Sequence, residues 1–168
     1  MEKERKDPLK SRKKRLLVFL WALVIAEAVM IFCFSAQNGE QSILTSTGIT
    51  AFVMRLVTPG FDSMSEAEQM AIIGQASHFV RKAAHFTEFA MLGASLRLLF
   101  HVLSLRRPVL FAWAAGALYA CTDEVHQMFV DGRGAMWQDV CIDSAGVLAA
   151  VLLATLWLQW RAKRRRRR

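Results

Sequence analysis

Residues 16–34 form a long apolar run, and this run limits how the chain can fold more than any other feature. Its 19 residues contain one charge, Glu27. A helix of about 20 apolar residues spans the hydrocarbon core of a bilayer. The run is too long for the apolar part of a signal peptide, and no cleavage motif of small residues follows it. We therefore predict an uncleaved first membrane span.

Three further segments have the length and character of spans, at residues 83–105, 109–130 and 139–160. The second contains Arg97 and His101, and the third becomes polar over its last third. In lipid, only helices and closed barrels satisfy their own backbone groups, and the alternation typical of a barrel is absent. The sequence predicts an all-α, four-helix transmembrane bundle over residues 16–160.

The basic residues predict the orientation of this bundle. Of 22 Lys and Arg residues, eight lie in residues 3–15 and seven in residues 161–168. Cytoplasmic loops are enriched in Lys and Arg, so both basic tails, residues 1–15 and 161–168, are expected inside the cell, with anionic inner-leaflet lipids as their partners. Although the pI is about 10.0, we expect no nucleic-acid partner, because 54% of the residues are hydrophobic and they fall in the predicted spans.

The extracytoplasmic loop, residues 35–82, is expected to carry interfacial helices. Ser65 and Glu68 form the pattern of a capping box. The helix that they open would lie at the membrane surface or continue directly into the second span. An apolar stretch at residues 49–57, ended by a Thr-Pro-Gly turn, favours a short interfacial or re-entrant helix.

Polar side chains collect where all four predicted spans meet the outer surface. His78, Arg81, His85 and Glu88 are spaced by three, four and three, which places them on one helix face. Ionisable groups in or near a membrane are costly and often functional, so we predict a shared outward-facing site. Its candidate ligand-binding residues are Gln37, Arg81, Lys82, His85, Glu88, Asp123, Glu124, His126, Gln127, Arg133, Asp139 and Asp143.

Other residues receive structural interpretations. Glu27 and Arg97 fall at similar depths, which predicts an ion pair between the first two spans. Three cysteines lie near the outer ends of spans and are expected as small buried hydrophobes rather than as a disulfide. They are Cys33, Cys121 and Cys141.

The order and spacing of the polar motifs resemble the VanZ-like family of bacterial integral membrane proteins. The matching motifs are residues 34–37 (FSAQ), 81–89 (RKAAHFTEF), 119–130 (YACTDEVHQMFV), 132–133 (GR) and 139–146 (DVCIDSAG). Phe89 stands where the family usually has Tyr, and Asp131 where it often has Pro. The resemblance implies a multi-pass protein of the bacterial plasma membrane, in a family whose named member is associated with resistance to the glycopeptide teicoplanin.

Two functional hypotheses follow for the outer site. In the first, Arg81, Lys82 and Arg133 bind the phosphate or carboxylate groups of a lipid-linked or other envelope ligand. In the second, the protein is an intramembrane hydrolase or transferase with a divalent metal as cofactor. The candidate metal ligands are His85, Asp123, His126, Asp139 and Asp143. The candidate catalytic residues are His85, Glu88, Asp123, Glu124 and His126. The spacing matches no known zinc signature.

Overall fold

The computed structural model describes residues 8–167 and consists of helices and their connections. The elements are α1 (Pro8–Ser35), α2 (Gly39–Val57), the short 3-10 helix η1 (Phe61–Ser63), α3 (Glu66–Val102), α4 (Pro108–Gln127) and α5 (Trp137–Arg166). These residues contain no strand, which confirms the all-α prediction. Helices α1 and α5 extend into the two predicted basic tails, since α1 begins at Pro8 and α5 ends at Arg166. Residues 1–7 and 168 of those tails lie outside the described part of the chain.

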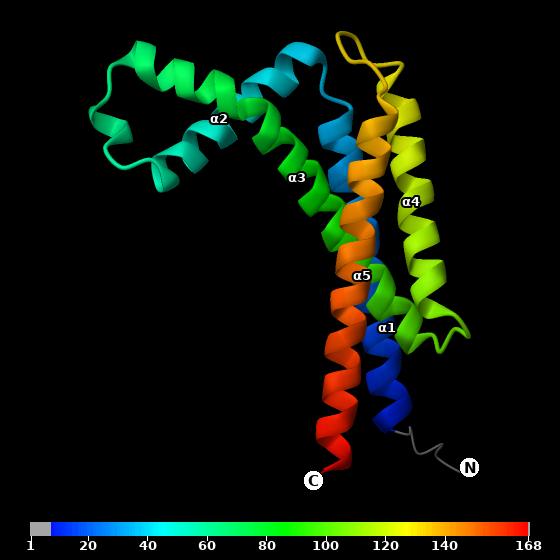
Figure 1. The fold of residues 1–168 in the computed structure, drawn as a ribbon. Helices are drawn as coiled ribbons and strands as arrows, with labels where there is room; N and C mark the ends of the chain where they lie inside the picture. Colours follow the sequence, from blue (N-terminus) through cyan, green and yellow to red (C-terminus); the bar gives the residue numbers. More distant parts are fainter. Residues whose placement is uncertain (1–7, 168) are drawn as a thin grey trace, which may run out of the picture.

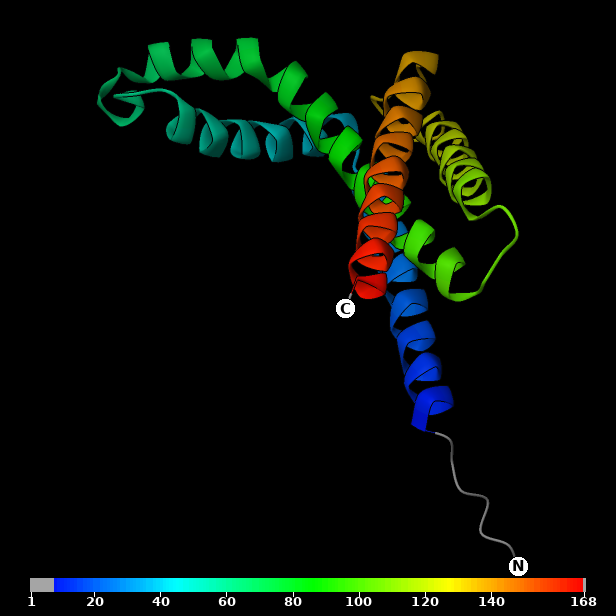
Figure 2. The ribbon, with the colours of Figure 1, turned by 60° about the horizontal axis from the view of Figure 1, so that its bottom comes forward.

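The helices form an upright bundle with an arm projecting from one end (Figures 1 and 2). The bundle consists of α1, α4, α5 and the C-terminal half of α3. The arm consists of α2, η1 and the N-terminal half of α3. The first residues of α1 and the last residues of α5 lie at the same end of the bundle, while the arm and the α4–α5 loop lie at the other end (Figure 1).

Helix α3 belongs to both parts because it runs without interruption through 37 residues. It starts at the predicted capping box, in which Ser65 and Glu68 bond to each other's backbone amides. It then follows α2 through the arm and bends into the bundle. The helix that we expected at residues 49–57 starts ten residues earlier, because Asn38 and Gln41 form a second capping box that opens α2.

Glycines allow α3, α4 and α5 to pack closely in the bundle. A Cβ atom at Gly146 would lie 2.4 Å from the backbone oxygen of Phe86, and one at Gly93 would lie 2.7 Å from that of Val147. At Gly116 it would meet the Val147 side chain at 2.6 Å. Small residues at such crossings let helix backbones approach each other. The core around them is apolar and includes Leu92 and Leu99.

Only two helices are long and apolar enough to cross a membrane by length and composition, within the described residues. These segments are Leu9–Ser35 and Trp137–Arg166. The predicted second and third spans lie in α3 and α4 and do not meet this criterion. Polar residues lower the hydropathy of both, among them Glu88 and Arg97 in α3 and Asp123 and Glu124 in α4.

Candidate functional site

The four polar stretches that we predicted to meet do come together, at the end of the bundle from which the arm projects. Arg133 Nη1, in the α4–α5 loop, donates hydrogen bonds to the carbonyls of Phe34 at 3.3 Å and Ser35 at 2.9 Å. Lys82 of α3 forms an ion pair with Asp139 of α5. The Asp143 carboxyl interacts electrostatically with carboxylates of three helices. Those carboxylates belong to Asp123, Asp139, Glu124 and Glu88.

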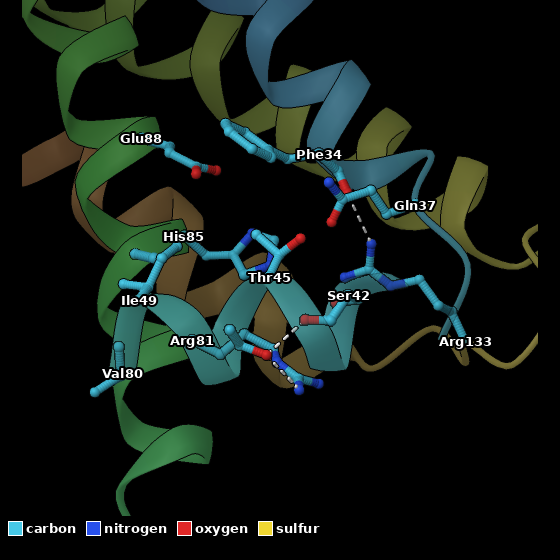
Figure 3. Close-up of a pocket in the computed structure, with 12 residues that line it drawn as sticks. Phe34, Gln37, Ser42, Thr45, Ile49, Val80, Arg81, His85, Glu88 and Arg133 are labelled. Atoms are coloured by element: carbon cyan, nitrogen blue, oxygen red, sulfur yellow. Dashed lines mark hydrogen bonds between the residues drawn. The ribbon is translucent and has the colours of Figure 1, made fainter. Parts of the chain in front are cut away.

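Two adjoining cavities lie between the arm and this end of the bundle. The smaller, of about 60 Å³, has a mostly apolar lining that includes Phe34, Ile49 and Val80 and reaches Glu88 (Figure 3). The larger, of about 260 Å³, is more polar and is bordered by His78, Lys82, Gln127 and Asp139. Both are lined by Ser42, Arg81, His85 and Arg133. These four residues therefore lie between an apolar chamber and a polar one.

Arg133 caps the C-terminus of α1 and also lines both cavities. Its two hydrogen bonds satisfy carbonyls at the C-terminus of α1, where a cation is favoured by the helix dipole. Both bonds use Nη1, which leaves Nη2 and Nε for other contacts. Partial burial lowers the pKa of Arg133, and the carboxylate of Asp123 opposes this shift. An arginine pKa starts so high that the group remains charged.

Arg81 is held by a residue that the sequence analysis missed. Its Nη2 donates to Ser46 Oγ of α2 at 3.0 Å. Ser42, Ser46 and Thr50 are buried on one face of α2, and two of their hydroxyls bond to the carbonyl four residues earlier. The spacing of four is visible in the sequence, but the prediction for this segment rested on the apolar residues 49–57, which do not include Ser42 or Ser46.

A backbone hydrogen bond also joins α2 to the α4–α5 loop. Gly39 N, in the first turn of α2, donates to the carbonyl of Asp131 at 2.9 Å. The next residue, Gly132, has a φ of +72°, a conformation that L side chains rarely adopt. Gly132 therefore lets the α4–α5 loop turn against the first turn of α2, which leaves Arg133 lining both cavities.

Several predicted site residues are engaged in local structure. The Glu124 carboxylate accepts a hydrogen bond from the backbone amide of Met136, the N-cap of α5. Gln127 Nε2 donates to Asp123 Oδ2 at 2.9 Å, and both side chains are buried. His126 stacks on Phe32, with ring centroids 4.6 Å apart, and lines neither cavity. The helical spacing could not show which side of α4 faces the cavities.

The metal hypothesis receives no geometric support. No group of three or more His, Cys, Asp or Glu side chains in residues 8–167 is arranged to hold a metal ion. Of the five candidate ligands, His126 packs against Phe32 and Asp139 pairs with Lys82.

Among residues 8–167, buried polar atoms without a hydrogen-bond partner in that part of the chain concentrate at this end of the bundle. Two of them, Arg81 Nε and His85 Nδ1, belong to residues that line both cavities. Three more belong to Ser35, His126 and Asp143. A buried polar group without a partner costs about 1–3 kcal/mol. Such a group next to a cavity is typical of a site that receives polar atoms from a ligand or from water.

The predicted ion pair between Glu27 and Arg97 is wrong. Glu27 accepts a hydrogen bond from Ser95 Oγ at 3.0 Å, whereas Arg97 Nε donates to Thr155 Oγ1 at 2.8 Å. Similar depth is not sufficient for pairing, because the two side chains leave their helices toward different neighbours. The expectation of buried cysteines is also wrong. Cys33, Cys121 and Cys141 are all free thiols, as expected, but they are exposed on the surface of the chain.

The family model described as VanZ/LLP1 matches residues 18–158. The chain belongs to the VanZ/LLP1 family. The match covers all the polar stretches of the site and so confirms the resemblance drawn from their motifs. Neither the curated proteins nor the solved structures yielded a match.

Proposed function

We propose that this VanZ/LLP1 family member crosses the bacterial plasma membrane four times and binds an anionic envelope ligand in its outward-facing cavities. The ligand class is a phosphate or carboxylate group, carried by a lipid or by another envelope component. The arm would lie along the outer surface of the membrane.

The distribution of polarity supports the membrane part of the proposal. Charged and polar side chains such as Glu27, Arg97, Asp123 and Asp143 are buried, while many large apolar side chains are exposed. Helix α2 repeats this inversion, because its buried face is Ser42, Ser46 and Thr50 and its exposed residues include Leu44 and Phe52. Large exposed apolar surfaces are rare in soluble monomers, and lipid would cover them.

The charge distribution supports four spans with both ends inside the cell. Helices α1 and α5 have their basic ends together, at the end of the bundle away from the arm (Figure 1). The Arg106-Arg107 pair follows α3 in the loop that leads to α4. An excess of Lys and Arg is typical of the cytoplasmic side.

The observation that carries the binding proposal is the position of Arg81 and His85 between two cavities, with one buried nitrogen on each lacking a partner. Arg133 and Lys82 add positive charge beside them. An arginine can bind a phosphate or carboxylate with two parallel hydrogen bonds. The apolar chamber next to these cations suits a ligand with a hydrophobic part.

Photo-crosslinking tests this proposal. The full-length protein in bilayers is irradiated with a photoactivatable prenyl phosphate, with the matching prenyl alcohol as a neutral probe. Arg81→Gln should reduce labelling by the phosphate probe by about tenfold, the effect of losing one charge-assisted contact. Arg55→Gln is the matched control, since Arg55 is exposed on α2 and pairs with Asp62 away from the cavities.

Unchanged labelling of Arg81→Gln, or equal labelling by the neutral probe, would overturn the binding proposal. The same variants address the resistance-type role that family membership suggests. If that role applies here, the unaltered chain expressed in a susceptible host raises the inhibitory concentration of teicoplanin. Arg55→Gln should keep this effect and Arg81→Gln should lose it.

A further inference from the structure

A second groove lies at the opposite end of the bundle, where α1 begins and α5 ends. It has a volume of about 470 Å³ and is formed by α1, the end of α3 and α5. Its lining includes leucines from all three helices, together with Trp157, Arg161, Ala162 and Arg165 of α5. None of these residues belongs to the outer site, so the groove needs an explanation of its own.

The groove combines an apolar floor with a cationic rim. Leucines from α1, α3 and α5 provide the floor, and the rim carries the positive charges of Arg161 and Arg165. The guanidinium carbon of Arg161 lies 4.7 Å from the centroid of the Trp157 ring, and both side chains line the groove. A contact of this kind holds the arginine beside the aromatic ring. An occupant that matches this surface has an apolar part and an anionic group.

Within the described residues, no Asp or Glu lies near these arginines. Residues 8–26, 89–122 and 144–167, which include all the described residues at this end of the bundle, contain neither. The last turn of α5 instead adds Lys163, Arg164 and Arg166. Arginines are usually balanced by acidic side chains or by an external anion, and no acidic side chain among residues 8–167 lies beside these two.

We infer that this groove binds an anionic phospholipid, with an acyl chain on the leucine floor and the phosphate between Arg161 and Arg165. In the proposed orientation this end faces the cytoplasm, where basic pockets between helices meet the anionic lipids of the inner leaflet. The inference uses different residues from the outer site. An experiment can therefore disprove lipid binding in this groove without disproving ligand binding at the outer site, and the reverse.

Native mass spectrometry of the full-length protein tests the inference by counting bound lipid. Phosphatidylglycerol and phosphatidylcholine with identical acyl chains are the probes. We expect the unaltered protein to retain phosphatidylglycerol. The Arg161→Gln/Arg165→Gln variant should bind this lipid at least about tenfold more weakly, since each basic residue near an anionic lipid surface contributes to the affinity. The control is Arg106→Gln/Arg107→Gln, which removes the same charge from the α3–α4 loop outside the groove.

A third variant separates the groove from general charge attraction. Ala162→Trp places a large side chain on the groove lining without changing the net charge, and it should also reduce phosphatidylglycerol binding. Glycerol 3-phosphate, which has the anion without the acyl chains, should not displace the lipid. Equal binding of both lipids, equal losses in the two double variants, or full binding by a folded Ala162→Trp protein would each overturn the inference.

Discussion

The bundle and the arm are assembled from different kinds of contact. In the bundle, α3 and α5 meet through Gly93 and Gly146, with backbone against backbone. In the arm, α2 meets α3 through small polar residues, and Arg81 bonds across to Ser46. The apolar side of α2 faces outward. Close backbone contacts therefore hold the bundle together, whereas the arm is attached by side chains that also line the cavities.

The difference has a functional consequence. A ligand that bonds to Arg81 or Arg133 would compete with or reinforce the contacts that attach the arm. The bundle offers no such competition, because its close contacts are made by backbone atoms and Val147. Three predictions test this comparison, beginning with the largest effect.

Gly146→Ala should destabilise the bundle by about 1–3 kcal/mol, the usual cost of overpacking. The added Cβ would lie 2.4 Å from the Phe86 carbonyl oxygen, so one of the two helices must move. Thermal unfolding of the purified protein in detergent measures this. Gly74→Ala is the control, because a Cβ at Gly74 meets nothing within 4 Å and alanine favours a helix. Equal melting temperatures for the two variants would contradict a bundle held by close backbone contact.

Ser46→Ala should loosen the arm and leave the bundle intact. The Arg81 guanidinium would lose its acceptor at 3.0 Å, a charged hydrogen bond worth about 1.5 kcal/mol. We expect amide hydrogen exchange in α2 to accelerate by about tenfold, with no change in the bundle part of α3. Ser77→Ala is the control, because Ser77 bonds only within α3, to the carbonyl of Gly74. Faster exchange throughout both regions would mean that arm and bundle unfold together.

The smallest effect concerns the first turn of α3. Hydrogen bonds from the Ser65 hydroxyl and amide lower the pKa of Glu68 below its usual value. The stabilisation of this turn is therefore complete above the ordinary glutamate pKa and is lost as the pH falls through the lower folded-state value. An NMR titration of the Glu68 carboxyl should show a midpoint that rises toward the ordinary value in Ser65→Ala. An unchanged midpoint would show that the Ser65 hydroxyl is not what lowers the pKa of Glu68.

Much of the fold could be predicted because apolar runs and capping boxes are local signals. The run at residues 16–34 lies within α1, and Ser65 and Glu68 open α3 as expected. The sequence left open whether the helix that begins after Ser65 lies at the membrane surface or continues into the second span. The structure shows a single helix, Glu66–Val102. The helix predicted at residues 49–57 was too short, because the first half of α2 has a polar face, with Ser42 and Ser46 buried, instead of a continuous apolar run.

The site was predicted as a set of stretches but not as a set of side-chain directions. The predicted topology placed four polar helix ends at the same end of the bundle. In the structure, Lys82 of α3 pairs with Asp139 of α5 at that end. Rotation of each helix about its axis decides the rest. That rotation turns His126 onto Phe32 and separates Glu27 from Arg97. It depends on which faces fit together, and a single sequence does not encode that locally.

The continuity of α3 links the two ends of the molecule mechanically. The same helix carries Arg81 and His85 at the two cavities beside the arm, and Leu98 and His101 at the groove at the opposite end of the bundle. His85 and Leu98 are 13 residues apart, which is about 20 Å along a helix axis. A displacement of the arm is therefore carried along α3 as far as its first close backbone contacts with α5, at Phe86 and Gly93, which hold the rest of the helix in place.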